Sequence, residues 1–153
     1  MATPREVRRL AFQLLFQLDA GATAEAMMAS APEGEGLSPK DQMKAAELAH
    51  GAFEARAESD REISELSPQW PVHRQAAVDR AILRLAHFEI ASGRTPPKVA
   101  VNEAVELAKE FSTERSPSFV NALLDKVLKR VLPGREESAT DGEGPGGLAP
   151  GQA

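Results

Sequence analysis

The chain has 153 residues, enough for one domain or two small lobes with a hydrophobic core of their own. It contains no cysteine, which excludes disulfides, thiolate zinc sites and cysteine nucleophiles. Its net charge of -5 at pH 7 excludes a protein that coats nucleic acid through its overall field, although a local basic patch is compatible with it. No apolar run approaches membrane-spanning length and the N-terminus is unlike a signal peptide, so we expect a cytoplasmic protein without membrane contact.

The fold class is predicted to be all-α, because Ala and Leu are frequent, β-branched alternation is absent and Gly and Pro fall at helix-like intervals. The first predicted helices cover about Pro4–Asp19, Thr23–Ser30, Pro39–Ser59 and Asp60–Leu66. Those that follow cover about Arg74–Ala91, Lys98–Phe111 and the stretch from Pro117 to the "LPG" motif, which makes about seven. Ser38 and Ser116 each precede a proline and are expected to be N-caps.

Two segments are predicted to lie outside the helices. The loop "APEGEGLSP" before the third helix is too rich in Gly, Pro and Glu to pack. From Pro133 onward the chain carries Gly, Pro and acidic residues without apolar periodicity. The sequence therefore predicts one helical domain over residues 1–132 and a disordered acidic tail over residues 133–153.

The first helix has two distinct faces. At about 100° per residue its core stripe collects Val7, Leu10, Ala11, Leu14 and Leu18. The opposite side carries Arg5, Arg9, Phe12 and Phe16, with Arg8 at its flank. Cations beside aromatic rings suit a single nucleic-acid strand, because guanidinium groups contact phosphates while rings stack on bases. Periodicity alone favours burial of both rings against a second layer of helices.

The last helix poses the same question at Phe119. Its predicted buried stripe consists of Val120, Leu123, Leu124, Val127 and Val131. Phe119 lies about a quarter-turn away, on the side of Lys126 and Arg130. This side is either the edge of the core with solvated cations or a surface that binds an anionic partner.

Acidic residues on two other helices are expected to be structural or solvated. The helix Arg74–Ala91 is predicted to be the most buried element, and Glu89 projects into its apolar side, where a carboxylate needs a partner such as an arginine. Glu103, Glu106 and Glu110 share one side of the next helix. That spacing favours a solvated face or a basic partner surface over a metal site.

Motifs for catalysis are nearly absent from the sequence. Glu47 and His50 form one E-x-x-H, which is half of the di-iron motif and has no second copy here. There is no Walker loop, G-x-S-x-G or Gly-rich dinucleotide turn. We therefore expect a protein that is not an enzyme and that holds no metal and no cofactor.

Three segments resemble the NusB family of bacterial transcription antitermination factors. They are "RRLAFQLLFQLD", "VDRAILRLAHFEI" and "PPKVAVNEAVELAKEFSTERSPSFVNALLDKVL", and the resemblance runs collinearly from about Arg5 to Leu132. It implies two packed helical bundles that bind the boxA element of ribosomal RNA leaders as single-stranded RNA. It also implies action with NusE, a small-subunit ribosomal protein, and indirectly with other Nus factors and RNA polymerase.

The resemblance also implies site residues. Phe12 is assigned to the core and Asp79 to the surface that meets NusE. The implied RNA-binding residues are Arg5, Arg8, Arg9, Gln13, Phe16, Ser116 and Phe119.

The sequence departs from the family pattern in its cations. Ser118 stands where relatives often carry a cation, and only three arginines lie near the N-terminus. Fewer phosphate contacts predict weaker, less salt-dependent RNA binding by the chain alone, so tight binding is expected to require NusE. The alternative is a helical module that binds NusE or a second copy of itself without RNA contact. A homodimer that covers the RNA face is compatible with the family.

Overall fold

A computed structural model describes residues 3–23, 37–70 and 74–131 of the chain, and these residues form six α-helices and no strand. The helices are α1 (Pro4–Asp19), α3 (Pro39–Glu54), α4 (Arg56–Leu66), α5 (Ala77–Ser92), α6 (Pro97–Phe111) and α7 (Ser116–Val131). The all-α prediction is therefore confirmed for this part of the chain. The expected helix Thr23–Ser30 and the expected tail over residues 133–153 lie outside the described residues.

Local sequence signals set several helix ends where they were expected. Thr3 caps α1 by accepting a hydrogen bond from the Glu6 amide at 3.1 Å, and Ser38 caps α3 in the same way with the Asp41 amide, also at 3.1 Å. Each cap is followed by a proline at the first helical position. Gly93 ends α5 in the left-handed region, at φ 73°, which a residue without a Cβ adopts freely.

The break between the third and fourth helices was predicted in the wrong place. It lies at Ala55 rather than near Ser59. No Gly or Pro marks this bend. A neighbouring side chain holds it instead: Arg56 donates to the Phe53 carbonyl at 2.7 Å, and its guanidinium lies 3.8 Å from the centroid of the Phe53 ring.

Two other helix starts differ from the prediction. Helix α5 begins at Ala77 rather than Arg74, because Arg80 donates to the Gln75 carbonyl at 3.4 Å and the Gln75 amide reaches back to the preceding loop. Helix α7 begins at Ser116 itself, one residue earlier than expected.

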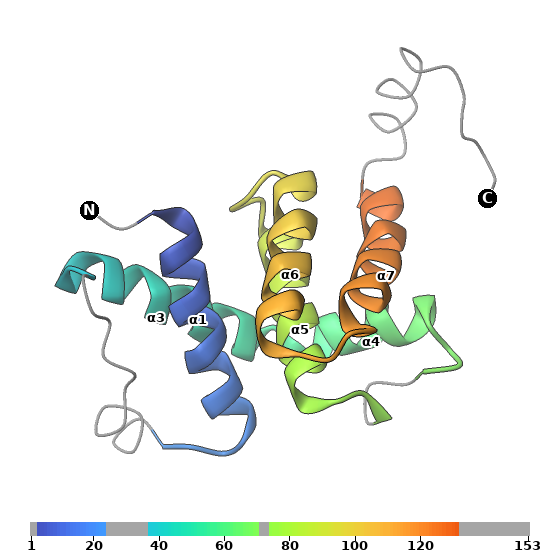
Figure 1. The fold of residues 1–153 in the computed structure, drawn as a ribbon, viewed down its shortest axis with the longest axis horizontal. Helices are drawn as coiled ribbons and strands as arrows, with labels where there is room; N and C mark the ends of the chain where they lie inside the picture. Colours follow the sequence, from blue (N-terminus) through green and yellow to red (C-terminus); the bar gives the residue numbers. More distant parts are fainter. Residues whose placement is uncertain (1–2, 24–36, 71–73, 132–153) are drawn as a thin grey trace, which may run out of the picture.

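The helices form two packed groups that share α5 (Figure 1). Helix α1 packs along α3, while α4, α6 and α7 pack around α5, which also contacts α1 and α3. The prediction that α5 is the most buried helix is confirmed, because Ile82, Leu83 and Leu85 are at most 1% exposed. Gly51 lets α3 approach α5 closely, since a Cβ there would lie 2.5 Å from Cζ of Phe88.

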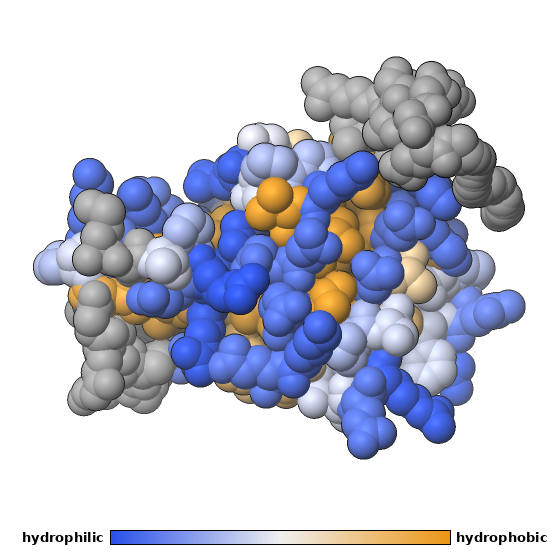
Figure 2. Space-filling view, turned by 45° about the horizontal axis from the view of Figure 1, so that its top comes forward, coloured by the Kyte–Doolittle hydropathy of each residue, from blue (hydrophilic) through white to orange (hydrophobic). Residues whose placement is uncertain are grey.

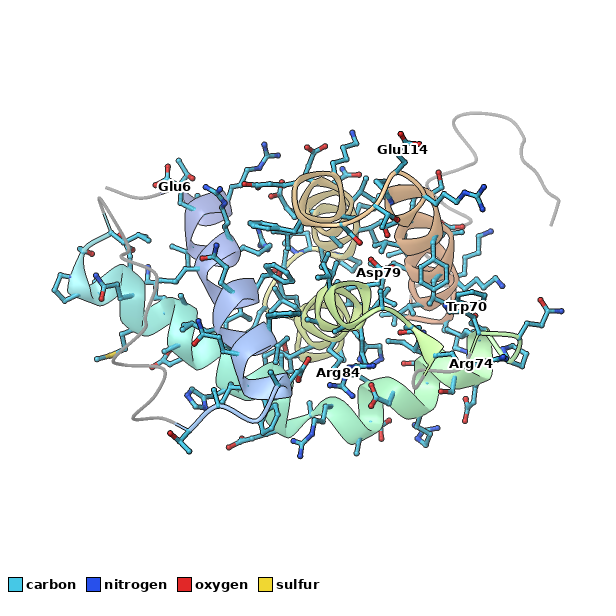
Figure 3. All side chains as sticks on the ribbon, turned by 60° about the horizontal axis from the view of Figure 1, so that its bottom comes forward. Glu6, Trp70, Arg74, Asp79, Arg84 and Glu114 are labelled. Atoms are coloured by element: carbon cyan, nitrogen blue, oxygen red, sulfur yellow. The ribbon has the colours of Figure 1, made fainter. Side chains whose placement is uncertain are left out.

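Buried polar contacts tie α4 and the end of α1 to α5. Arg84, labelled in Figure 3, pairs with Asp19 at 3.0 Å and donates to Asp60 at 2.8 Å. Burial raises the pKa of Asp19, although the charge of Arg84 opposes this. His87 is 3% exposed and lies within hydrogen-bond distance of Ser59 at 2.8 Å. The contacts of Asp60, Ser59 and His87 satisfy polar groups inside the fold, whereas the buried oxygens of Asp19 have the ion pair with Arg84 and no hydrogen bond of good geometry within the described part of the chain.

The outer surface is mixed. Figure 2 shows charged and polar side chains over most of one face, with hydrophobic surface between them near its centre. No helix of the described residues has the length and apolar character needed to cross a membrane.

Candidate nucleic-acid interface

The basic side of α1 faces carboxylates of α6. Arg5 donates two hydrogen bonds to the Glu103 carboxylate, from Nε at 3.0 Å and from Nη2 at 2.9 Å. Arg9 pairs with Glu110, and its guanidinium lies 5.6 Å from the centroid of the Phe111 ring. The hydrogen bond from Arg5 lowers the pKa of Glu103, with burial opposing the shift. The glutamates of α6 were expected to form a solvated face or to meet a partner's basic surface; instead Glu103 and Glu110 pair with arginines of the chain's own first helix.

Arg8 has a different environment from its two neighbours. Only 11% of its side chain is exposed, and its Nε donates to both carboxylate oxygens of Glu89, at 2.8 and 3.0 Å. Thr95 donates a further hydrogen bond to Glu89 at 2.8 Å. The prediction that Glu89 needs an arginine partner is confirmed. Arg8 thus joins α1 to α5 inside the protein, and its predicted contact with RNA stays a prediction.

The aromatic residues of α1 divide as the family resemblance implied. Phe12 is 3% exposed and packs in the core, whereas Phe16 is 37% exposed. Their ring centroids lie 6.3 Å apart, and the Phe12 centroid lies 5.0 Å from that of Phe111. Gln13 is partly buried on the same helix. The exposed Phe16 ring is held beside the buried Phe12 ring, which suits a stacking surface.

The connection from α6 to α7 is held by a network of hydroxyls on one buried carboxylate. Asp79 is 9% exposed and accepts hydrogen bonds from Ser112 at 2.7 Å and from Ser116 at 3.0 Å. Ser116 is 3% exposed and also lies 3.0 Å from the Thr113 hydroxyl. Figure 3 shows Asp79 between α5 and α7. Asp79 and Ser116 are therefore buried, and their hydrogen bond fixes the start of α7 against α5.

Phe119 lies at the start of α7, packed on the edge of the core. It is partly buried, and its ring centroid lies 6.3 Å from that of Trp70 at an interplanar angle of 62°. Helix α1 ends, α6 ends and α7 begins along the lower edge of Figure 1. The fold thus brings the aromatic residues near these three helix ends to one side of the molecule.

The cations farther along α7 are not part of that edge. Lys126 donates to the Leu66 carbonyl at 3.3 Å, and Arg130 donates to Glu62 at 3.3 Å and to Glu65 at 3.0 Å. These contacts tie α7 to α4. The cations that follow Phe119 therefore take part in packing between helices, an arrangement that the sequence did not indicate.

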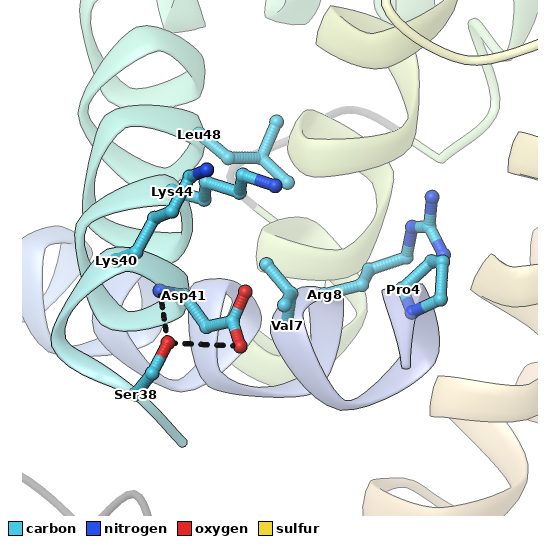
Figure 4. Close-up of a pocket in the computed structure, with 8 residues that line it drawn as sticks. All are labelled: Pro4, Val7, Arg8, Ser38, Lys40, Asp41, Lys44 and Leu48. Carbon is cyan, nitrogen blue, oxygen red and sulfur yellow. Dashed lines mark hydrogen bonds between the residues drawn. The ribbon is translucent and has the colours of Figure 1, made fainter. Parts of the chain in front are cut away.

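A separate hollow of about 700 Å³ lies between the first turns of α1 and α3 (Figure 4). Two of its charged groups are already engaged: Asp41 accepts a hydrogen bond from the Ser38 hydroxyl, and the Arg8 guanidinium donates to Glu89. The lining residues are Pro4, Val7, Arg8, Ser38, Lys40, Asp41, Lys44 and Leu48. Apolar side chains and the two lysines Lys40 and Lys44 line the hollow together. The lysine charges favour binding of an anion over binding of a cation.

The described residues hold no arrangement typical of a metal centre. No three His, Cys, Asp or Glu side chains gather closely enough there to bind an ion. Glu47 and His50 of the E-x-x-H motif are both exposed on α3. Glu106, the remaining glutamate of α6, pairs with Lys109 at 3.3 Å.

Sequence reasoning missed two features of this interface. It did not pair the arginines of α1 with the glutamates of α6, because that pairing depends on how the two helices pack against each other. It also overlooked Trp70, the single tryptophan of the chain, which lies in the short "SPQWP" connection. A large aromatic residue in a polar loop was the available signal.

Comparisons with known proteins fit this geometry. The model of the NusB family matches residues 5–129. The chain belongs to the NusB family. A transcription antitermination protein NusB from Symbiobacterium thermophilum is 45% identical over 135 residues, covering 82% of this chain and 88% of the relative. As a member of the NusB family, the chain is a transcription antitermination factor and not an enzyme.

Solved structures of the NusB family share the fold. NusB of T. maritima superposes with a TM-score of 0.72 at 34% identity, covering 84% of this chain and 93% of that one. A chain from a crystal structure of NusB and NusE in complex with double-stranded RNA has the same TM-score, 0.72, at 23% identity, and covers 82% of this chain and 96% of its own. At that identity the second likeness supports the fold alone.

Proposed function

We propose that this chain binds the boxA element of ribosomal RNA leaders as a single strand, together with NusE, and so supports processive transcription of ribosomal RNA. Membership of the NusB family supports this assignment. The structural observation that carries it is on α1, where Phe16 is 37% exposed and the side chains of Arg5 and Arg9 are 64% and 52% exposed. Other Nus factors and RNA polymerase would be indirect partners, and the site of action would be the bacterial cytoplasm.

The proposed RNA-binding residues differ in the kind of contact they would make. Arg5 and Arg9 have side chains that are 64% and 52% exposed, so they can reach phosphates. Phe16 and Phe119 would stack on bases, and Gln13, one turn before Phe16 on α1, would add a polar contact. Arg8 and Ser116 are buried, so they would support the RNA-binding surface from inside the protein.

NusE is needed because the chain's own carboxylates compete with RNA. Arg5 and Arg9 are already paired with Glu103 and Glu110, so a phosphate must replace a carboxylate at each. Each replacement gains less than a contact made by an unpaired cation. We propose that Asp79 contributes to the NusE surface by holding the connection between α6 and α7.

The division of the chain also belongs to this proposal. Residues 1–132 would form the RNA-binding domain. The segment 133–153 carries four acidic residues and one arginine, so it would repel phosphate rather than bind it.

The proposal is tested by titrating the chain with NusE into fluorescently labelled boxA RNA at physiological salt. Phe16→Ala is expected to weaken binding by about 1 to 3 kcal/mol if a base stacks there. Met43→Ala, which changes a side chain that is 65% exposed on α3, serves as the matched control and should leave affinity unchanged.

Two results would contradict the proposal. Unchanged RNA affinity of both Phe16→Ala and the double variant Arg5→Ala with Arg9→Ala would favour the protein-interaction module without RNA contact. Equal affinity of the chain with and without NusE would disprove the role assigned to NusE.

A further inference from the structure

Trp70 presents an exposed aromatic face at a fixed position. It is 50% exposed and is the only tryptophan of the chain. Its ring meets that of Phe119 edge-on, at an interplanar angle of 62°. In such an arrangement the two rings do not cover each other's faces as a parallel stack would. Phe119 thus supports Trp70 and leaves aromatic surface available to a third ring.

The backbone amide and the backbone carbonyl of Trp70 are both hydrogen-bonded. Its amide donates to the Ser67 carbonyl at 3.0 Å, and its carbonyl accepts a hydrogen bond from the Gln75 amide at 3.3 Å. Gln75 is itself only 5% exposed. An aromatic side chain of this size that stays half exposed on a hydrogen-bonded backbone offers apolar contact area to a partner, and tryptophan is enriched at interfaces for this reason.

Two arginines near Trp70 have no carboxylate partner among the described residues, in contrast to the arginines of α1. Arg115 lies one helical turn before Phe119, whose amide donates to the Arg115 carbonyl at 3.2 Å. Arg74 follows Trp70 by four positions, and Figure 3 shows both at the edge of the molecule near α7. Both arginines are exposed, and within residues 3–23, 37–70 and 74–131 neither has a carboxylate partner. A phosphate can bind here without displacing a carboxylate.

We propose that Trp70 stacks on a base of single-stranded RNA, with Arg115 and Arg74 on the flanking phosphates. This inference rests on the proposed function and extends the RNA path from the end of α1, past the end of α6 and Phe119, to the connection between α4 and α5. The combination of an exposed aromatic face with unpaired guanidinium groups favours RNA over a protein partner.

The test compares Trp70→Ala and Trp70→Phe in the complex with NusE, using labelled boxA RNA. Trp70→Ala is expected to weaken RNA binding about tenfold, whereas Trp70→Phe retains affinity within about threefold because a ring remains. Val131→Ala is the control, since it removes an exposed apolar side chain at the other end of the same helix as Phe119.

Fluorescence gives an independent readout on the unmodified chain. A stacked base quenches indole emission, so boxA RNA should quench the wild-type complex more than the Trp70→Phe complex, which supplies the background from NusE. This measurement needs no alanine variant and holds even if Trp70→Ala fails to fold.

The outcomes separate this inference from the proposed function. RNA binding with no quenching of Trp70, and with unchanged affinity of a folded Trp70→Ala, overturns the inference and leaves the proposed function standing. Weaker association of Trp70→Ala with NusE, at unchanged RNA affinity, assigns the surface to the protein partner and also overturns it. No RNA binding by the wild-type complex defeats the proposed function itself.

Discussion

Replacing Arg8 with alanine should destabilise the fold far more than replacing its neighbours. The substitution removes the guanidinium that donates two hydrogen bonds to Glu89, whose side chain is 1% exposed. After the change only the Thr95 hydroxyl, at 2.8 Å, is left among the contacts described for that carboxylate. A buried charge without its partner is the costly outcome of breaking an internal ion pair.

The expected magnitude follows from this burial. Breaking a buried pair by removing one partner costs about 3 to 5 kcal/mol. For a domain of this size that corresponds to a fall in melting temperature of roughly 10 to 20 °C. Arg5→Ala is the matched comparison: its side chain is 64% exposed and its pair with Glu103 should contribute only about 0 to 1 kcal/mol.

Thermal denaturation followed by circular dichroism measures both variants. A third variant, Arg8→Met combined with Glu89→Leu, should recover most of the lost stability, because apolar residues of similar size remove the unpaired charge. The reasoning is refuted if Arg8→Ala melts within about 2 °C of Arg5→Ala. If the reasoning is correct, RNA-binding experiments should replace Arg5 and Arg9 but keep Arg8. A variant without Arg8 would bind RNA less because it unfolds, and this could not be told apart from the loss of an RNA contact.

Three further predictions concern stability, acid sensitivity and salt. Gly51→Ala should lower stability by about 1 to 2 kcal/mol in chemical denaturation, because a Cβ 2.5 Å from the Phe88 ring forces that ring to move; an unchanged midpoint would contradict the close contact. Glu103 has its pKa lowered from 4.5, so its ionised form stabilises the fold above pH 4.5 and this contribution is lost as the pH falls through the lowered pKa. In Glu103→Gln, the melting temperature should therefore fall less steeply as the pH decreases below 4.5 than it does in the wild type. The same dependence of melting temperature on pH in both proteins would argue against the pairing. Arg115→Ala should reduce the slope of log affinity for boxA RNA against log salt by about 1, and an unchanged slope would exclude a phosphate contact there.

Helix positions were predictable where local chemistry decides them. Thr3 and Ser38 cap helices that begin with a proline, and Gly93 ends one in the left-handed region. The bend at Ala55 was not predictable in this way, because Arg56 holds it by contacts with Phe53 that no turn signal announces. The start of α5 was not predictable for the same reason, because the Gln75 side-chain amide donates a hydrogen bond to the carbonyl of Trp70, five positions earlier.

The candidate interface was predictable only in part. Periodicity placed Phe16 and Arg9 on the same side of α1, yet it favoured burial for both aromatic rings of that helix. The resemblance to the NusB family separated Phe16 from Phe12 correctly, at 37% and 3% exposure. Neither source indicated that Arg9 would meet Glu110, because pairing between helices depends on how they pack and not on either helix alone.

The pairing of the α1 arginines with the glutamates of α6 has a consequence for target discrimination in a cell full of competing polyanions. Under the proposed function, a nucleic acid that contacts Arg5 and Arg9 must displace Glu103 and Glu110, so these two cations give a random strand little net gain from charge. Only a strand whose unpaired bases also reach the aromatic rings recovers the difference. The internal carboxylates would thus act as a filter against duplex DNA and structured transfer RNA, without a single base-specific hydrogen bond.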